Sequence, residues 1–482
     1  MSVELHVERG RIRRVLPLAD GVVVRTETTT HTFPGCFAFP GFVDNHCHLY
    51  GLGKRLTTVS LHTAASADEC IRRLSAPSTT FSGWVLGMGW NEELWSDRSP
   101  AAFALLHAAF AGTPVVAMRI DGHAAWLNSE ARRACGLDVD DLSVLLDADM
   151  DVIFKTMPTP TREEIKSMLL AAARECSSKG ITEVHDMDVD PLWLEALREL
   201  AEAGTLPIRI QSFLRAQHDE WDEAGLLPAG GEFLRVCGIK LFADGALGSR
   251  GALLLEPYAD KPDTLGIQLL SVEEMVERIT RAIDAGWWSV AIHAIGDAAN
   301  RNTLDAIERA RAWEGGKDML FRIEHAQHLH TSDVARFAEL DVFACVQPTM
   351  QVSDASMAVA RLGSSRQADA YRWRTLLDAG ARLGAGSDFP IEEPGPLAGI
   401  IAFTERKGTE RITREEALRA YTLGAHETAD MAYRRGRIVE GNDADIVILD
   451  RDIATCSAEE LRSTTVIATI TAGVVRYQHH AS

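Results

Sequence analysis

The feature of this chain that most constrains its fold is a repeated unit, in which a helical stretch is followed directly by an apolar strand. In the first clear unit, Thr161 stands three residues before Glu164 as in a capping box, apolar residues follow at spacings of three and four, and Gly180 ends the helix. A strand-like run, residues 181–188, comes next. The unit recurs over residues 271–294, 300–326, 331–348 and 374–390. Repeated β/α units indicate a parallel sheet, and their number favours a closed barrel over an open, doubly wound sheet.

The two ends of the chain differ from this middle part because they are rich in short strands. Residues 1–39 and 426–482 contain runs of Val, Ile and Thr that are interrupted by Gly and by Asp-Gly turns. We therefore predict that both termini together build one small β domain and that residues 40–425 between them form a barrel. Residues 51–160 fit the β/α rhythm poorly, and we interpret them as an insertion after the first barrel strand that covers the barrel mouth.

Composition and charge limit the classes of partner. The chain has 482 residues, of which 46% are hydrophobic and 24% charged, which is typical of a globular protein and excludes disordered, collagen-like and coiled-coil classes. The formal net charge of -20 disfavours nucleic acid and anionic membranes as partners and leaves a small-molecule substrate. The sequence leaves open whether the chain forms a homo-oligomer.

The cellular compartment is indicated by the termini and the cysteines. The first 18 residues alternate polar and apolar side chains and lack the apolar region of a signal peptide. No window approaches the roughly 20 apolar residues of a membrane span. The eight cysteines contain no CxxC pair, which argues against a disulfide framework and a structural zinc ribbon. We expect a cytoplasmic protein.

The residues that point to chemistry are histidines at the ends of apolar runs. His46 and His48 end the first such run, and residues i and i+2 of a strand face the same side, about 6.6 Å apart at roughly 3.3 Å per residue. His293, His325 and Asp388 each follow another short run. Because the carboxyl ends of barrel strands meet at one mouth, we expect these side chains to share one space. Such ligands suit zinc, and also manganese, iron or nickel.

Lys240 is unusual because it lies within an apolar strand, where an unpaired ammonium is costly, and an ammonium has no lone pair for a metal. Three interpretations remain open from the residues alone. Lys240 could form a Schiff base, pair with Asp244 or another carboxylate, or be carbamylated by carbon dioxide and bridge two metals. Cys47, between the two histidines, is expected to face away from them and to fill the core.

Several long segments together resemble the amidohydrolase superfamily, in particular its amidohydrolase-3 or YtcJ-like subgroup. PGFVDNHCH resembles the first-strand metal motif, and KLFADGALGSRGALL resembles the fourth-strand motif of the subgroup. HAIGDAANRNTLDAIE, RIEHAQH and GSDFPIEEPGP resemble the fifth-, sixth- and eighth-strand segments, and residues 415–450 are similar to the last helix and the return into the β domain.

The resemblance implies an α/β fold, a (β/α)₈ TIM-like barrel with a composite β-sandwich domain. It also implies one or two divalent metal ions, zinc foremost, with Lys240 as the carbamylated bridge. The ligand positions it implies are His46, His48, Lys240, His293, His325 and Asp388.

A hydrolytic function follows from such a site. The ions lower the pKa of a water toward neutrality and polarise the carbonyl, while Asp388 passes the proton of that water to the leaving nitrogen. We predict hydrolysis of a non-peptide carbon–nitrogen bond, as in an N-substituted formamide or N-acyl amine. One alternative is a deaminase of a heterocycle or cyclic amidine. Another is a non-catalytic regulatory or binding protein, which the intact ligand set disfavours. A nucleotide-dependent enzyme is disfavoured because no P-loop and no full GxGxxG motif occurs.

The candidate substrate contacts are less specific. His123 resembles part of a subgroup motif and is a candidate hydrogen-bond partner of the substrate, or has a structural role beside Asp121. Asp244 and Arg250 either contact the substrate region or form an ion pair that fixes the fourth-strand loop. Tryptophans of the insertion either build its own core or line an apolar pocket, with Trp90 as the candidate. The four tryptophans are Trp84, Trp90, Trp95 and Trp126.

Overall fold

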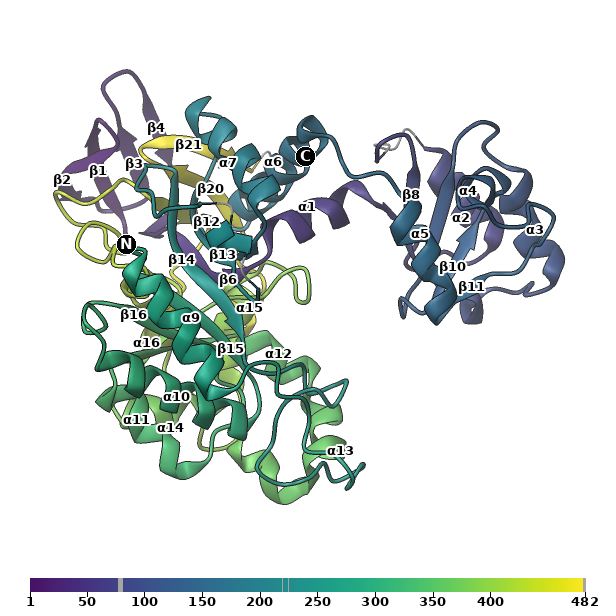
Figure 1. Ribbon diagram of the computed structural model, residues 1–482. Coiled ribbons are helices and arrows are strands. Elements are labelled where there is room, and N and C mark those ends of the chain that lie inside the picture. Colours follow the sequence, from purple (N-terminus) through teal and green to yellow (C-terminus); the bar gives the residue numbers. More distant parts are fainter. Residues whose placement is uncertain (77–80, 219, 224, 480–482) are drawn as a thin grey trace. The chain divides into compact units, whose positions relative to one another are not determined.

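The computed structural model describes residues 1–76, 81–218, 220–223 and 225–479, and it divides into two compact units (Figure 1). The larger unit comprises Met1–Leu49 and Ala173–Ser482, and the smaller unit comprises Tyr50–Ala172. Residues 77–80 of the predicted insertion and residues 480–482 of the predicted β domain lie outside the described residues.

The larger unit contains an eight-stranded sheet, which confirms the predicted β/α barrel. Every hydrogen-bonded pair of neighbouring strands in it is parallel. The strands are buried along most of their length, as expected where helices cover the outer face of a parallel sheet. In spatial order they are β18 (Arg382–Ala385), β17 (Val342–Val346), β16 (Leu320–His325), β15 (Ser289–Ala294), β14 (Leu234–Phe242), β13 (Arg209–Arg215), β12 (Ile181–Val189) and β6 (Phe42–Cys47).

The last and first strands of the barrel meet closely at their carboxyl ends. The backbone N–H of Asp388 donates to the carbonyl of His46 at 2.7 Å, next to the end of β6. A Cβ atom on Gly386 would lie 2.4 Å from the backbone nitrogen of His46, and one on Gly384 would lie 2.8 Å from the side chain of Asn45. Glycine is required at both positions because any larger residue would separate the two strands.

Helices pack around the barrel strands, and α10 contacts β15, α11 contacts β17 and α14 contacts β18 (Figure 1). The helices of this unit are α7 (Pro191–Glu202), α8 (Glu220–Glu223), α9 (Val272–Asp284), α10 (Asp297–Arg311), α11 (Val334–Glu339), α12 (Pro348–Ser353), α13 (Ala355–Arg366), α14 (Trp373–Asp378), α15 (Pro396–Glu405), α16 (Arg414–Ala420), α17 (Leu423–Glu427) and α18 (Ala458–Arg462). Helix α6 (Arg162–Ser178) begins as the sequence predicts, because the hydroxyl of Thr161 accepts the N–H of Glu164 at 3.3 Å.

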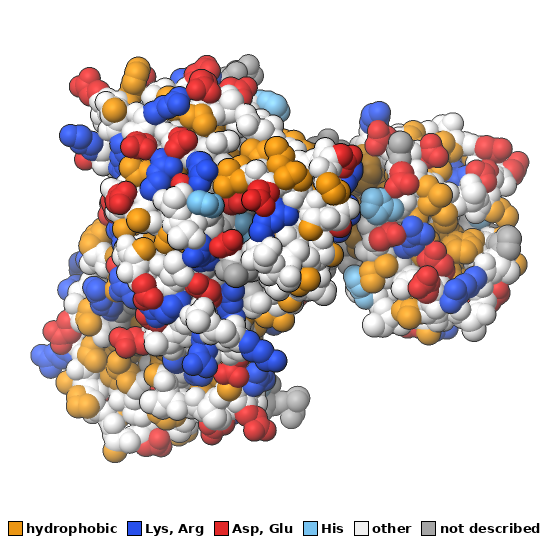
Figure 2. Space-filling view, turned by 90° about the horizontal axis from the view of Figure 1, so that it is seen from below, with side chains coloured by type: hydrophobic (Ala, Val, Ile, Leu, Met, Phe, Trp, Pro, Cys, Tyr) orange, Lys and Arg blue, Asp and Glu red, His pale blue; other side chains and the backbone are white. Residues whose placement is uncertain are grey.

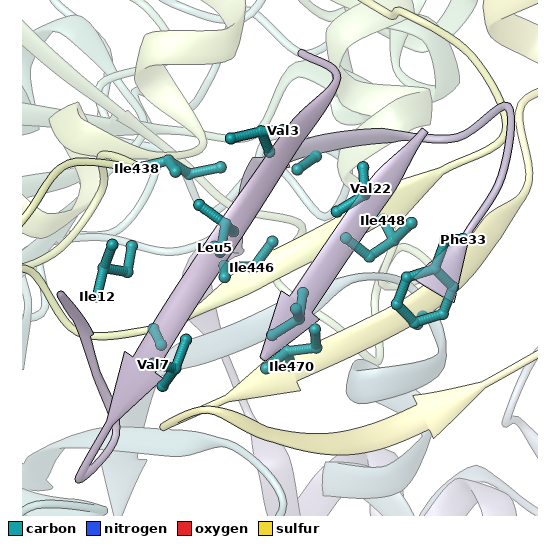
Figure 3. Packing of buried hydrophobic residues seen from close by; sticks show 14 residues of the cluster. Val3, Leu5, Val7, Ile12, Val22, Phe33, Ile438, Ile446, Ile448 and Ile470 are labelled. Atoms are coloured by element: carbon teal, nitrogen blue, oxygen red, sulfur yellow. The ribbon is translucent and has the colours of Figure 1, made fainter. Parts of the chain in front are cut away.

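Both termini form the second part of the larger unit, a composite β-sandwich, as predicted. One sheet has the order β2 (Arg11–Pro17), β1 (Val3–Glu8), β3 (Val22–Arg25) and β4 (Thr30–Phe33). The other has the order β21 (Val474–Gln478), β20 (Val466–Thr471), β19 (Ile446–Leu449) and β5 (Phe37–Pro40). Alternate residues of β1 point inward and pack with isoleucines of β19 and β20 in one apolar core (Figure 3).

Arg435 connects the barrel to the β-sandwich segment. Its buried guanidinium donates from Nη1 to Glu183 of β12 at 2.6 Å and from Nε to Asp443 at 2.8 Å. Burial alone would raise the pKa of Glu183, but Arg435 and the neighbouring His426 outweigh it and hold that pKa well below its usual range. Glu183 is therefore a carboxylate that pairs with this guanidinium, while Asp443 also pairs with Arg434 at 2.6 Å.

Replacing Arg435 by Met is expected to lower the free energy of unfolding by about 3–5 kcal/mol, because it removes the guanidinium that pairs with the buried carboxylate of Glu183. Chemical denaturation followed by circular dichroism measures this change. Arg437→Met is the matched control, because Arg437 is exposed on the same segment and its replacement should cost little. Equal effects of the two substitutions would show that the buried contacts do not stabilise the unit.

The smaller unit is built around a five-stranded mixed sheet. In spatial order its strands are β11 (Leu145–Leu146), β10 (Ala124–Leu127), β9 (Val115–Arg119), β8 (Val85–Trp90) and β7 (Val59–Ser60). Its helices are α2 (Ala67–Ser75), α3 (Pro100–Ala108), α4 (Ser129–Ala134) and α5 (Asp151–Thr156), and α1 (Leu49–Thr57) enters it from the larger unit. That this unit covers the barrel mouth stays a prediction.

The tryptophans of this unit are buried in its two apolar cores. Trp90, Trp95 and Trp126 lie in one core with ring centroids 5.7–6.2 Å apart, and Trp84 lies in the other. The indole N–H of Trp90 donates to the carbonyl of Ala117 at 2.8 Å. The four side chains thus serve the packing role that the sequence analysis weighed against a pocket.

Acidic and basic side chains are interspersed over the face of the molecule in Figure 2. Of the helices in the described residues, none is both long enough and apolar enough to cross a membrane.

Candidate metal centre

The carboxyl ends of the barrel strands bring five of the predicted ligand residues to one cavity of about 430 Å³ in the larger unit. His46 lies near the carboxyl end of β6, and His48 directly follows that strand. His293 and His325 lie in β15 and β16. Asp388 stands three residues after β18, where this strand lies against β6. The convergence that the strand-end pattern predicts is therefore present in the fold.

Three of these residues have the spacing of a metal site. The Nε2 atom of His46 lies 3.4 Å from Oδ1 of Asp388, and the Nε2 atom of His48 lies 3.1 Å from the same oxygen. All three ligand atoms lie within 4.8 Å of one another. Ligands about 2.0–2.1 Å from a tetrahedral zinc ion are about 3.4 Å from one another. The two distances to Asp388 are therefore close to those between ligands of one divalent ion.

The other ring nitrogens of these two histidines are held by acceptors. Nδ1 of His46 donates to Oε2 of Glu324 at 2.5 Å, and Nδ1 of His48 donates to the backbone carbonyl of Met187 at 3.1 Å. A proton on Nδ1 leaves Nε2 of each ring as the atom that can bind a metal, and the carboxylates of Asp388 and Glu324 outweigh burial and raise the pKa of His46. Partners of this kind orient metal-binding histidines and fix their tautomer.

His293 and His325 form the opposite part of the cluster. Their ring centroids are 4.4 Å apart, and the ring of His325 is 5.0 Å from that of His46. Nδ1 of His325 donates a hydrogen bond to Oε1 of Gln347 at 2.7 Å. Burial, together with neighbouring His46, lowers the pKa of His325 to about 3, and burial also lowers the pKa of His293. Both rings are neutral at physiological pH, the form that binds a metal.

Asp388 is held as a carboxylate. Burial alone would raise its pKa, but the neighbouring His46 and His48 outweigh it and hold that pKa well below its usual range. Its Oδ1 atom has no hydrogen-bond partner among the described residues. The backbone has a positive φ of 60° at Asp388 and of 75° at His325, a conformation that few residues other than glycine adopt. Such strained positions cluster at functional sites.

Lys240 lies in β14 and is fully buried. Among the described residues its Nζ atom has no hydrogen-bond partner and no ion pair, and it lies 4.5 Å from the ring centre of Phe242, which lines the cavity. The ion pair with Asp244 that the sequence left open is not formed. Burial lowers the pKa of Lys240 to about 8, so part of the population is a neutral amine. An unpartnered buried amine is costly, and the cost is removed if the amine is modified or gains a ligand.

Asp244 and Arg250 do not pair with each other. Asp244 is buried and accepts the backbone N–H groups of Leu253, Ile295 and Gly296, and its Oδ1 lies 3.4 Å from Nε2 of His293. Burial raises the pKa of Asp244 to about 7. Asp244 therefore holds the loops after β14 and β15 in place and lies next to the ring of His293. The contact of either residue with substrate stays a prediction.

Arg250 and His123 are bound to acidic neighbours. Arg250 donates to Asp260 at 2.9 Å. His123 belongs to the smaller unit, where its exposed ring donates to Asp147 at 2.8 Å and its backbone N–H donates to Asp121. Trp90, with 1% of its surface exposed, has no free face in its unit. The predicted contacts of Arg250, His123 and Trp90 with substrate stay predictions. The burial of Trp90 does not favour such a contact.

Three residues that support the ligands were missed by the sequence analysis. Arg322 is fully buried and donates to Glu324, which in turn accepts from His46, and Gln347 accepts from His325. Glu324 directly precedes His325 at the end of an apolar strand, and a carboxylate in that position could have been recognised. Gln347 has no comparable pattern, because its role depends on the approach of β17 to β16.

Replacing Gln347 by Met is expected to weaken metal binding by about 10–100-fold, because His325 loses the acceptor that fixes its orientation. Titration of metal-free protein with zinc in a competing chelator measures the affinity. Gln268→Met, at an exposed position of the same unit, is the matched control. Unchanged affinity in the Gln347 variant would mean that His325 does not contribute to the site.

A parallel barrel with such a donor set at its mouth defines the class of metal-dependent barrel hydrolases. Residues 34–477 match the model of the amidohydrolase family, and the chain belongs to that family. The predicted family resemblance is thereby confirmed.

Similar proteins agree with this assignment. The chain is 31% identical to YtcJ of Bacillus subtilis (strain 168) over 98% of this chain and 97% of that protein. It is 25% identical to the N-substituted formamide deformylase of Arthrobacter pascens over 92% of this chain and 89% of that enzyme. A crystal structure of an uncharacterized metal-dependent hydrolase from Pyrococcus furiosus has a TM-score of 0.79 at 29% identity, and the match covers 94% of this chain and 100% of that chain.

Proposed function

We propose that this hydrolase cleaves a non-peptide carbon–nitrogen bond of a small amide, such as an N-substituted formamide or an N-acyl amine. The observation that carries the proposal is the convergence of His46, His48 and Asp388 on one point, next to the unpartnered amine of Lys240. The similarity to an N-substituted formamide deformylase supports the substrate class. A cavity of about 430 Å³ has the size of a small-molecule site.

Different side chains of the cavity would bind the metal, transfer the proton and orient the metal ligands in such a reaction. His46, His48, His293 and His325 would hold one or two divalent ions, most readily zinc, together with Asp388. A bound ion acidifies water and polarises a carbonyl. Asp388 accepts a proton from the attacking water and donates it to the nitrogen as the carbon–nitrogen bond breaks, so that the products are a carboxylic acid and an amine. Glu324 and Gln347 keep the imidazoles oriented during these steps.

Lys240 is proposed to react with carbon dioxide and to form a carbamate. The neutral amine attacks the carbon of carbon dioxide and loses a proton, and the product carries two oxygen donors. The complete burial of Nζ and its pKa of about 8 support this step, because both favour the neutral amine. Carbon-13 NMR of protein equilibrated with labelled bicarbonate tests it, and Lys240→Met should abolish the carbamate resonance.

The experiment that tests the function compares metal-free and zinc-loaded protein on amides and on a cyclic amidine. Release of a carboxylic acid and an amine from an N-alkylformamide, dependent on the metal, is the expected result. Metal-free protein with full activity would contradict the proposal. Release of ammonia from the cyclic amidine alone would indicate a deaminase instead. Zinc binding without turnover of any compound would indicate a binding or regulatory protein.

A further inference from the structure

The cavity beside the metal centre has a wall that the proposed reaction does not use. This wall is mostly apolar, with Leu247, Ile295, Met350 and Met357 among the residues that line it. Asp354 and Glu392 also line the cavity and are not among the predicted ligands. A substrate whose carbonyl lies at His46 and Asp388 would place the rest of its length against these side chains.

Both carboxylates accept hydrogen bonds from residues of the segments that follow β16 and β17. Oδ2 of Asp354 accepts from the hydroxyl of Tyr371 at 2.8 Å and from Nε2 of Gln327 at 3.0 Å, and Gln327 stands two residues after His325. Oε1 of Glu392 accepts from the hydroxyl of Ser353 at 2.6 Å. These contacts fix one oxygen of each carboxylate, and among the described residues the second oxygen of each has no hydrogen-bond donor.

The charge of Asp354 and Glu392 is not offset by a Lys or Arg among the described residues of the cavity wall. Among the described residues that line the cavity, none is Lys or Arg. Within the described part of the chain, neither Asp354 nor Glu392 forms an ion pair with Lys or Arg. Arg361 of α13 donates to the carbonyl of Gly248 at 3.1 Å and to Asp260, and Arg250 also pairs with Asp260. Arg250 and Arg361 therefore pair with Asp260 and do not line the cavity.

We propose that the substrate is an amide whose amine half carries an ammonium group, which Asp354 and Glu392 bind, and carries no carboxylate. This inference rests on the proposed amide hydrolysis. An ammonium has three donors that suit the free oxygens of two fixed carboxylates, and the apolar wall accommodates the methylene chain between the ammonium and the amide. A carboxylate in the same place would face two like charges with no cation to bind it. N-acylated amino acids and dipeptides would therefore be poor substrates.

The experiment compares three formamides of matched length on the zinc-loaded enzyme. They are the mono-N-formyl derivative of putrescine, N-pentylformamide and the N-formyl derivative of δ-aminovalerate, whose far ends are cationic, neutral and anionic. We expect kcat/KM to fall in that order, with about tenfold to hundredfold between the cationic and the neutral compound, which is the range that a hydrogen bond to a charged group supplies. The difference should lie mainly in KM and should shrink at high salt.

The double variant Asp354→Asn and Glu392→Gln tests whether these two side chains cause the preference. Each amide retains an oxygen that can accept from Tyr371 or Ser353, so the wall should keep its shape. The ratio of kcat/KM between the cationic and the neutral formamide should fall by at least about tenfold. Glu339→Gln, at an exposed position at the end of α11, is the matched control and should leave the ratio unchanged.

Calorimetric titration of the zinc-loaded protein with putrescine and with pentylamine gives a readout that does not depend on turnover. Putrescine should bind more tightly, and the double variant should lose this difference. Equal or better hydrolysis of the anionic formamide, or an unchanged ratio in the double variant, would overturn the inference alone. If N-pentylformamide and the other two formamides are not hydrolysed at all, the proposed function fails, and the inference fails with it.

Discussion

Replacing Asp388 by Asn is expected to lower kcat for amide hydrolysis by about 10²- to 10⁴-fold, the contribution of a positioned general acid–base group. Asn cannot take a proton from the attacking water and return it to the leaving nitrogen. The fold should be retained, because Asn tolerates the positive φ of 60° that the backbone adopts at this residue. Steady-state kinetics on zinc-saturated variant protein measures the change.

Asp318→Asn provides the matched control for this variant, since Asp318 is exposed in the same unit. It should have the kcat of the unaltered protein. Metal content must be measured for both variants, because Asp388 is also a proposed ligand. If the Asp388 variant binds zinc and retains its kcat, another group moves the proton, and the role assigned to Asp388 is wrong.

Replacing His46 by Ala is expected to weaken metal binding by more than about 100-fold, which exceeds the usual effect of losing a partner that only orients a ligand. His46 offers its Nε2 atom 3.4 Å from Oδ1 of Asp388, so its loss removes one of three convergent donors. Hydrolysis should fall to the level of the metal-free protein. Elemental analysis after dialysis against a weak chelator measures the bound ion.

The control for this variant is His479→Ala, which removes an exposed imidazole near the end of the described chain. It should keep both metal and activity. Circular dichroism separates loss of metal from loss of fold, which is needed because His46 is buried and donates a hydrogen bond to the buried Glu324. A folded His46 variant with a full complement of metal and normal turnover would contradict the proposed centre.

The barrel and the convergence of its strand-end residues could be predicted because both depend on local pattern. His46, His293 and His325 each end an apolar run, and the geometry of a parallel barrel places such ends at one mouth. The composite sandwich could be predicted from the runs of Val, Ile and Thr at both ends of the chain, and Val3, Leu5 and Val7 of β1 are buried in its core.

The partners of the ligands could not be predicted, because they depend on register and side-chain conformation across the barrel. Glu324 meets His46 from a position 278 residues away, and Gln347 reaches His325 only because β17 lies beside β16. The prediction that Trp90 contacts substrate depends on residue type alone and stays a prediction. Apolar side chains in an inserted segment serve a core of their own as readily as a pocket, and the sequence does not separate the two.

Anomalous diffraction at the zinc edge, from crystals of protein that hydrolyses an N-alkylformamide, tests the central claim most directly. We expect an ion about 2.0–2.2 Å from Nε2 of His46, Nε2 of His48 and an oxygen of Asp388. We also expect additional density on Nζ of Lys240. Active crystals with no anomalous peak among these residues at the zinc, manganese, iron or nickel edges would contradict it.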